Sequence, residues 1–250
     1  MPDPTKGIGT EFMRLTRYEH SSPSPQQLGL PQPPLTRRHP EALDGIPLPT
    51  PGGLTIPPVS LLHLITNRTS LRSYSDTDIS LLELSALLWS TQGVKEIYAN
   101  RATLRTVPSA GARHALETYL LLNRVSGIEP GLYQYLPIEH EIARIPAAPE
   151  LPADAAGACL GQNMLTGCAA AFFWCADPRR MTWRYGQRGY RYLHLDAGHI
   201  CQNLYLAAEA IGCGACAIAA FDDEALAGLL RLDEEEFVIY CATVGKKTGK

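Results

Sequence analysis

The segment Arg68-Thr-Ser-Leu-Arg72 combines residues that could bind an anion. Arg68 and Arg72 supply two guanidinium groups, and Thr69 and Ser70 supply two hydroxyls. Arginine offers a permanent charge and a forked set of N–H donors, which suits a phosphate group. A solvated basic loop would have the same composition, so the segment alone does not decide between the two readings.

A second segment, running from residue 105 to residue 112, could present its backbone to a flat ligand. Pro108 restricts the backbone, while Ser109, Ala110 and Gly111 are small enough to let main-chain atoms approach closely. The alternative is an ordinary turn that leads into the next strand. Neither reading is favoured by the composition alone.

The segment from Met181 to Arg191 holds three aromatic residues, two glycines and several arginines. Within it, Arg184 and Tyr185 could offer a cation and a phenol to a substrate, and we regard them as candidate catalytic residues. Arginines that stack on aromatic rings in an interface loop would have the same composition. The two readings are equally compatible with the sequence.

The fourth segment, from Gly212 to Asp222, is a run of small residues. Such a run, which includes Ala219 and Ala220, leaves backbone N–H groups free to face a ligand. Cys213 and Cys216 form a Cys-x-x-Cys pair, but no second pair stands at metal-binding spacing, and no strand-to-helix pattern of a thioredoxin surrounds it. We therefore predict no metal site.

Composition limits the possible partners. The net charge of -3 gives no global positive field for nucleic acid or an anionic membrane. No apolar run is long enough to cross a bilayer, and the polar start of the chain lacks the apolar part of a signal peptide. The seven cysteines are odd in number and scattered, which is not typical of a disulfide framework. These features favour a cytoplasmic protein.

Residues 1–57 differ from the rest because prolines recur from Pro23 to Pro57. This density opposes long helices and sheet ladders and favours extended chain. A disordered leader is one reading. Regularly spaced aliphatic residues favour the other, an arm that wraps a partner surface, because disordered segments are usually poorer in them. We expect an arm at 1–57 and a folded domain at 58–250.

The elements that must position these segments follow from hydrophobic spacing. Ser80 and Glu83 predict a capping box at the start of a helix that ends near Ser90, and Gly212 is expected to end a long helix. Helices are predicted over 58–67, 80–90, 150–165, 190–211 and 222–231, and strands over 118–125, 131–136, 140–145, 169–176 and 237–244. The pattern indicates an α+β domain with one sheet between helical layers.

In this order and spacing the segments resemble the nitroreductase superfamily, and specifically its SagB-type dehydrogenase branch. The resemblance extends over roughly residues 58 to 247 and is strongest in the tracts Thr103–His114, Glu117–Tyr119, Gly131–Tyr133, Trp183–Tyr192 and His194–Tyr205. It implies a nitroreductase-like fold with a mixed sheet between helical layers. It also implies an intertwined homodimer with one FMN at each of two subunit boundaries.

The resemblance assigns roles to the segments that would hold FMN. Arg68 would bind the phosphate or ribityl region, together with Thr69 and Ser70, and Arg72 would lie near the N1–C2=O2 edge of the ring. Lys246 or Lys247 would reach the phosphate.

The family pattern also assigns two segments to the ring itself. Pro108, Ser109, Ala110 and Gly111 match the stretch that the other subunit places against it. Ala219 and Ala220 match the backbone beside flavin N5, where some nitroreductases have Glu-Gly. That departure removes a carboxylate and leaves main-chain contact.

Arg184 and Tyr185 occupy the place of a Lys-Tyr pair that is implicated in proton removal in SagB-type azoline dehydrogenases. Arginine keeps its proton and cannot be a general base. The substitution therefore argues against azoline oxidation by the same route and leaves Tyr185 as the candidate proton donor or acceptor.

The resemblance implies an FMN-dependent oxidoreductase with ping-pong hydride transfer between NAD(P)H or an organic donor and a small or peptidic acceptor. Its direction stays open, between dehydrogenation of a peptide heterocycle and reduction of a nitroaromatic or quinone. The alternative from another class is a non-catalytic flavin-binding or interaction module that docks through its proline-rich arm.

Overall fold

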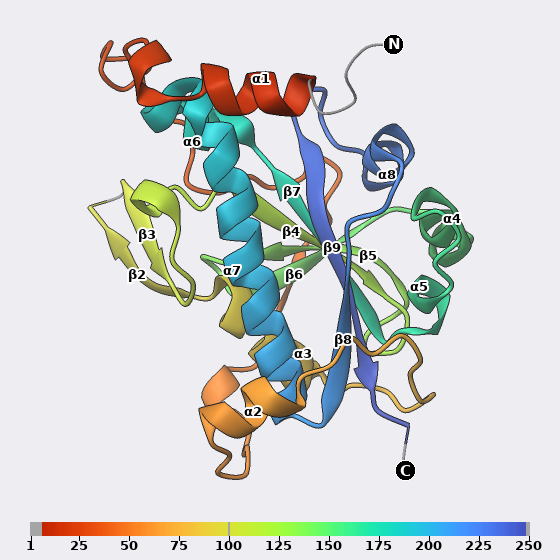
Figure 1. Ribbon diagram of the computed structural model, residues 1–250. Coiled ribbons are helices and arrows are strands. Elements are labelled where there is room, and N and C mark those ends of the chain that lie inside the picture. Colours follow the sequence, from red (N-terminus) through yellow and green to blue (C-terminus); the bar gives the residue numbers. More distant parts are fainter. Residues whose placement is uncertain (1–6, 100, 249–250) are drawn as a thin grey trace.

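The computed structural model describes residues 7–99 and 101–248, which build a seven-stranded sheet with helices on both of its faces and a separate two-stranded sheet (Figure 1). Residues 1–6, 100 and 249–250 lie outside the described residues. They include the start of the expected arm and the end of the expected domain. The strand order is β1-β6-β5-β4-β7-β9-β8. The strands are β1 (Gly45–Pro47), β4 (Leu116–Leu122), β5 (Gly131–Leu136), β6 (Glu141–Ile145), β7 (Ala170–Ala176), β8 (Cys213–Ile218) and β9 (Phe237–Lys246).

One face of the sheet is covered by the long helix α7 and its neighbours, and the other face by three short helices (Figure 1). The first layer holds α2 (Leu61–Asn67), α3 (Leu81–Gln92), α6 (Pro178–Tyr185) and α7 (Gly189–Ala210). The second holds α4 (Leu151–Ala158), α5 (Met164–Gly167) and α8 (Asp223–Leu230). Within the described part of the chain, no helix combines the length and apolarity that a membrane crossing needs.

Two hydrophobic clusters, one on each face, explain the apolar strand sequences. In β7, Phe172 and Trp174 belong to one cluster, and Phe173 and Cys175 belong to the other. Successive side chains of a strand point to opposite faces, so a strand covered on both sides is apolar throughout. The same alternation makes every residue of β4 buried. These two central strands form the rigid support for the segments at their ends.

The expected helix starts and ends are confirmed where capping signals were present. The Ser80 hydroxyl accepts a hydrogen bond from the Glu83 amide (3.2 Å), and the Glu83 carboxylate accepts one from the Ser80 amide (2.8 Å). This capping box starts α3. Helix α7 ends at Ala210, and Gly212 follows with a φ of 72°. Glycine adopts this left-handed conformation without steric cost.

The α+β fold class is confirmed, with one correction to the sheet. A mixed sheet was expected, but all six pairings between its neighbouring strands are antiparallel. Parallel pairing enters through isolated bridges, Ser70 with Ala215 and Ile79 with Val125.

Three sets of elements were not predicted from the sequence. Helix α6 occupies part of the segment that was read as a loop, and β8 occupies the run of small residues. A hairpin of β2 (Val94–Tyr98) and β3 (Ala102–Arg105) precedes the 105–112 segment. The single helical region expected over 150–165 is divided into α4 and α5.

Residues 7–57 contact the folded part of the same chain, and the expected contact with a partner surface stays a prediction. The Gln26 amide donates to the Trp183 carbonyl (2.8 Å), the Trp183 indole donates to the Leu30 carbonyl (2.9 Å), and the Leu48 amide donates to the His140 carbonyl (3.1 Å). These contacts span three parts of the arm. The proposed boundary at residue 57 stays a prediction.

The expectation that prolines oppose sheet ladders in the arm was wrong at β1. Helix α1 (Ile8–Leu15) and the short turn η1 (Tyr18–His20) precede the proline run, and η2 (Pro51–Gly53) is a single short turn within it. Strand β1 pairs with β6 at the edge of the sheet. An edge strand tolerates Pro47 because only one of its sides carries a ladder.

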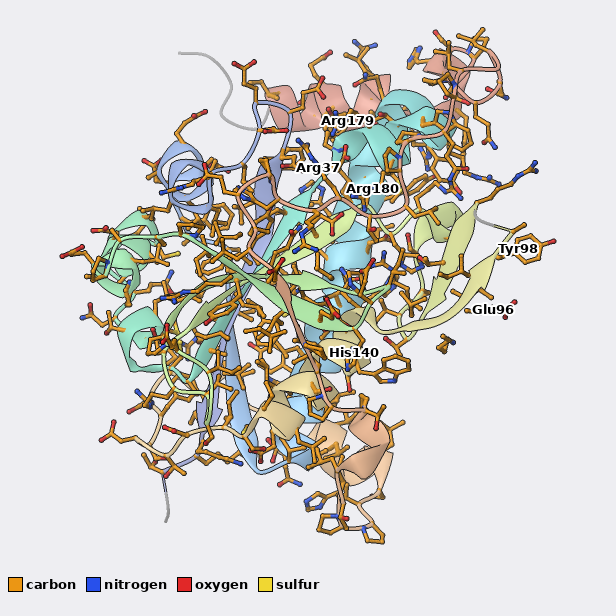
Figure 2. The ribbon with its side chains drawn as sticks, turned by 180° about the vertical axis from the view of Figure 1, so that it is seen from behind. Arg37, Glu96, Tyr98, His140, Arg179 and Arg180 are labelled. Carbon is orange, nitrogen blue, oxygen red and sulfur yellow. The ribbon has the colours of Figure 1, made fainter. Side chains whose placement is uncertain are left out.

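A buried ion pair joins the arm, α6 and β4. The side chains of Arg180 and Glu117 are 3% and 2% exposed, and they form a salt bridge. Arg180 also donates to the carbonyls of Leu35 (3.2 Å) and His114 (3.1 Å), while the Arg37 amide donates to Glu117 (2.8 Å). Figure 2 shows Arg37 and Arg180 converging on this point behind the sheet.

Replacing Arg180 with Met should lower the free energy of unfolding by about 3–5 kcal/mol, because the variant leaves the Glu117 carboxylate buried without its partner. Urea unfolding of the two proteins measures the difference. Arg144→Met is the matched control, since Arg144 and Glu129 pair on the surface with 42% and 76% exposure. A surface pair of this kind contributes at most about 1 kcal/mol. An Arg180→Met loss as small as that of the control would contradict the role given to the buried pair.

Candidate active site

Tyr205 of α7 connects the Arg68–Arg72 segment with the edge strand β8. The Tyr205 hydroxyl lies 3.1 Å from the Ser70 hydroxyl and accepts a hydrogen bond from the Ala217 amide (2.7 Å). The Arg68 guanidinium lies 5.1 Å from the centre of the Tyr205 ring. We call Arg68, Ser70, Arg72, Tyr205 and Ala217 the Tyr205 cluster. It joins two of the four segments that the sequence singled out.

Glycine at position 214 allows this approach. The Leu71 amide donates to the Ala215 carbonyl (2.9 Å), so the 68–72 segment runs against the edge of β8. A Cβ at Gly214 would lie 2.4 Å from a methyl group of Leu71. Any larger residue at this position would push the segment away, so the small-residue run has a packing reason.

The donor set of the Tyr205 cluster fits the phosphate of FMN. Arg68 and Arg72 form no salt bridge with a carboxylate of the described chain. Thr69, Ser70 and Arg72 are exposed, and so are Ala219 and Ala220, which follow Ala217 after the end of β8. Two unpaired guanidiniums and two accessible hydroxyls are what a dianionic group requires.

Lys246 and Lys247 lie nearby but are engaged in ion pairs. Lys246 contacts Glu83, and Lys247 contacts Glu209 at 2.5 Å. Lys246 stands opposite Cys213 in the β8–β9 ladder, on the same stretch of sheet as Ala215. Their contact with a phosphate stays a prediction, because each lysine would have to exchange its present carboxylate for the ligand.

The other two segments also meet, around Asp196 of α7. The Ala110 amide donates to the Asp196 carboxylate (3.2 Å), and the Ser109 hydroxyl accepts from the His114 amide (2.9 Å). Gly111 has a φ of 58°, and a Cβ there would lie 2.6 Å from the Tyr185 hydroxyl and 2.7 Å from Arg184. Only glycine satisfies both the conformation and the close contact. We call Pro108–Gly111, Arg184, Tyr185 and Asp196 the Asp196 cluster.

The carboxylate of this cluster is held in a poorly solvated position. Burial raises the pKa of Asp196, and the Ser109 hydroxyl and the Ala110 amide oppose this rise. One of its oxygens, Oδ2, is buried without a hydrogen-bond partner in the described chain. Tyr185 packs edge-on against Tyr192, with 4.8 Å between the ring centres. Arg184 is exposed and Asp196 is buried, so the cluster combines an accessible cation and the Tyr185 phenol with a buried carboxyl group.

The two clusters do not form one site within a single chain. Asp196 and Tyr205 stand nine positions apart on α7. That spacing corresponds to about two and a half turns and about 13 Å, so their side chains leave the helix on opposite sides.

The Cys-x-x-Cys pair has no chelating geometry. Cys213 and Cys216 are both buried in β8, and residues three apart in a strand point to opposite faces. Burial raises the pKa of Cys213 to about 11 and also raises that of Cys216. Both thiols are therefore held in the unreactive protonated form.

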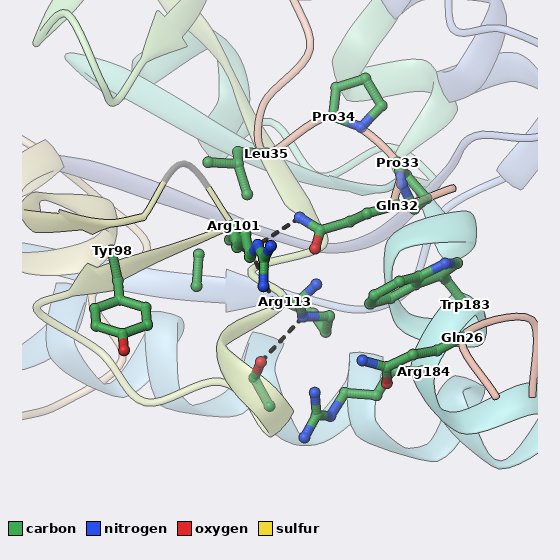
Figure 3. Close-up of a pocket in the computed structure, with 12 residues that line it drawn as sticks. Gln26, Gln32, Pro33, Pro34, Leu35, Tyr98, Arg101, Arg113, Trp183 and Arg184 are labelled. Carbon is green, nitrogen blue, oxygen red and sulfur yellow. Dashed lines mark hydrogen bonds between the residues drawn. The ribbon is translucent and has the colours of Figure 1, made fainter. Parts of the chain in front are cut away.

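A pocket of about 690 Å³ opens beside the Asp196 cluster (Figure 3). Gly111 and Arg184 line it together with Arg101, Arg113 and Trp183, and the arm supplies the remaining wall. Sequence reasoning did not assign Arg101, Arg113 or Tyr205 to a site. The density of arginine between residues 101 and 113 was a usable signal, whereas Tyr205 could only be recognised once α7 was placed against β8.

Residues 65–246 match the Nitroreductase family, so the chain belongs to that family. A nitroreductase-type protein of Methanocaldococcus jannaschii is 34% identical over 189 residues, which cover 76% of this chain and 92% of the relative. The trifolitoxin-processing protein TfxB of Rhizobium leguminosarum bv. trifolii is 35% identical over 140 residues. That match covers 54% of this chain and 37% of TfxB, so this chain spans well under half of that relative.

Solved structures show the same fold. A nitroreductase-type protein from Ralstonia eutropha has a TM-score of 0.66 and 24% identity, over 88% of this chain and 100% of that one. The E. coli microcin synthetase McbBCD complex with truncated pro-MccB17 bound has a TM-score of 0.61 and 21% identity, over 80% and 77%. An FMN-dependent nitroreductase from Clostridium difficile has a TM-score of 0.52 and 14% identity, over 76% and 89%. With TfxB, the microcin complex supports the SagB-type branch of the family.

The pH dependence of stability should reveal how His114 is held beside this site. Burial and repulsion from Arg105, Arg113 and Arg180 lower the pKa of His114 from 6.5 to about 3. Between these values the unfolded chain binds a proton that the folded chain does not, so stability is lost as the pH falls through this window. His114 should contribute a slope of up to about 1.4 kcal/mol per pH unit.

His114→Asn should remove this slope, and asparagine tolerates the φ of 44° found here. Urea unfolding at about pH 7, 5.5 and 4.5 compares the variant with the wild type and with His194→Asn, which changes an exposed histidine. Equal slopes in all three proteins would show that His114 is not held neutral by the fold.

Proposed function

We propose that this chain is an FMN-dependent oxidoreductase of the SagB-type branch that transfers hydride between NAD(P)H or an organic donor and a small or peptidic acceptor. The supporting observation is the Tyr205 cluster, which places unpaired guanidiniums next to an exposed backbone of small residues. Family membership supports an oxidoreductase, and a neighbour of the same fold is FMN-dependent.

Arg68, Ser70 and Arg72 would hold the phosphate and the adjacent edge of FMN. Their side chains are accessible and close together, and they lack competing carboxylates in the described chain. Ala219 and Ala220 would face the ring with backbone groups. When bound, FMN would supply two-electron transfer, for which the protein provides position and electric field. A guanidinium near the ring would stabilise the negative charge of reduced FMN.

A second copy of the chain would complete the site by placing its Pro108–Gly111 stretch against the ring. The separation of the two clusters along α7 supports a homodimer. Exposed apolar residues of α2 support it as well, since Leu61 is 62%, Leu62 is 73% and Ile65 is 51% exposed. Large apolar side chains that cluster on a surface usually mark an interface.

Within the Asp196 cluster, Tyr185 would donate or accept a proton and Arg184 would bind the substrate. The structure places both side chains against Gly111, which would lie at the ring. Arg184 keeps its charge and so can orient an electron-rich group, but it cannot remove a proton. A tyrosine flanked by a guanidinium is suited to hydrogen bonding with a substrate oxygen or nitrogen.

The relatives support a proposal for the acceptor class, and the cysteines support one for the location. TfxB is a trifolitoxin-processing protein, and the McbBCD structure contains a bound peptide precursor, which favours a peptidic acceptor delivered by partner proteins. All seven cysteines are free thiols buried in the fold. This usage favours a reducing compartment such as the cytoplasm.

Purified protein should be yellow, elute as a dimer and lose its flavin absorbance on anaerobic addition of NADH or NADPH. Reoxidation by a nitroaromatic or quinone would complete the cycle. An absorbance spectrum combined with light scattering during size-exclusion chromatography tests both parts. Protein that stays colourless with excess FMN, or a monomer that retains FMN tightly, would contradict the proposal. A yellow protein that no donor reduces would instead support a flavin-binding module.

Arg68→Ala should raise the FMN dissociation constant by about tenfold to a hundredfold. The lost contact is a charge-assisted hydrogen bond, worth about 1.5–3 kcal/mol. Titration of the apoprotein with FMN, followed by quenching of flavin fluorescence, measures the change. Arg144→Ala removes a charge far from the Tyr205 cluster and should bind FMN as the wild type does. Full FMN retention in Arg68→Ala would exclude this contact.

A further inference from the structure

Three arginines from three separate segments face the pocket beside the Asp196 cluster. Arg101 lies in the turn just before β3, Arg113 follows the Pro108–Gly111 stretch, and Arg184 comes from the last turn of α6. Figure 3 shows all three side chains around one opening. None of them forms a salt bridge with a carboxylate of the described chain, and no aspartate or glutamate is among the lining residues.

The positive charges in this pocket repel one another in the free protein. Arg113 is 9% exposed, and its charge is close enough to that of Arg184 for the two to repel. Its guanidinium donates to the carbonyls of Gly111 (3.0 Å) and Arg101 (3.2 Å), which hold it in place. Guanidinium groups that are held in place by carbonyl oxygens but have no carboxylate partner form a preformed binding site for an anion.

Between these polar groups the pocket wall also has apolar parts, and much of this apolar surface comes from the arm. Pro33, Pro34 and Leu35 form one side, and Tyr98 and Trp183 stand on others. The Gln32 side chain donates to the Arg101 carbonyl (2.8 Å), the same oxygen that Arg113 contacts, so the arm is held to the pocket rim. A volume of about 690 Å³ is in the usual range for a small-molecule site.

We propose that this pocket binds the carboxylate or phosphate of an apolar, ring-bearing molecule, and that residues 26–35 of the arm form part of its specificity wall. The inference rests on the proposed function, because the pocket would hold the reactant that exchanges hydride with the flavin. The anion contacts Arg101, Arg113 and Arg184. The apolar body lies against the prolines and aromatic rings. A neutral molecule of the same shape lacks the charge contacts.

Isothermal titration calorimetry of the full chain at low salt tests the pocket without any turnover. Benzoate should bind, and benzyl alcohol should bind at least about tenfold more weakly, because it lacks the charge-assisted contacts. Arg101→Gln and Arg184→Gln should each weaken benzoate by about tenfold. Lys95→Gln is the matched control, since it removes an exposed charge of the same hairpin that does not line the pocket.

Two further titrations identify the source of the anion. If NADP⁺ binding depends on Arg101 as benzoate binding does, the pocket takes a nucleotide phosphate. If only benzoate depends on it, the pocket takes the carboxylate of the other reactant. Equal binding of benzoate and benzyl alcohol, or an equal loss in Arg101→Gln and Lys95→Gln, would overturn the proposal.

The test separates this inference from the proposed function. Benzoate binding is measured on oxidised protein and needs no electron donor. A flavin that no electron donor reduces would refute the oxidoreductase while leaving the arginine-dependent titration intact. Conversely, Arg101→Gln protein whose flavin is still reduced, but whose benzoate affinity is unchanged, would refute the pocket alone.

Discussion

The buried ion pair of Arg180 and Glu117 is the interaction on which the arrangement of the site depends. Removing two charges from water is costly, and the cost is offset only when each charge is fully compensated. Here three arginines (Arg37, Arg105 and Arg180) stand near three acids (Glu117, Asp177 and Glu236), so each buried charge has groups of opposite charge around it. Arg180 also contacts the carbonyls of Leu35 and His114. One guanidinium therefore holds the arm, α6 and the end of the 108–114 stretch to strand β4.

The second constraint is the length of α7, which separates two halves of the site. One cluster gathers around Tyr205, where the sheet edge and the 68–72 segment meet. The other gathers around Asp196, where the glycine of the 108–111 stretch packs against α6. A rigid helix cannot bend to bring both onto one small ligand. In the proposed homodimer, each copy would supply one half to each of two equivalent sites.

The sequence predicted the elements whose apolar spacing is regular and missed those that tertiary contacts decide. Helices α3 and α7 were found because their apolar residues follow helical spacing, and strands β4 and β7 because they are continuous apolar runs. Helix α6 was missed because its buried positions include Arg180, whose partner Glu117 stands 63 residues earlier. The Asp177 cap and Pro178 at its first position were a usable start signal. Strand β8 consists of small residues with weak strand preference, so its pairing with β9 decides its structure.

The arm links the two questions of stability and specificity. Its backbone takes part in the buried network through Leu35 and Arg37, and its side chains border the pocket from Gln26 to Leu35. A change in this arm would therefore alter both how α6 is held and what the pocket admits. A surface segment tolerates sequence change better than a strand of the core does, since fewer of its side chains are buried. The arm side chains that line the pocket can consequently change, while the arginine donors and the two clusters on α7 stay in place.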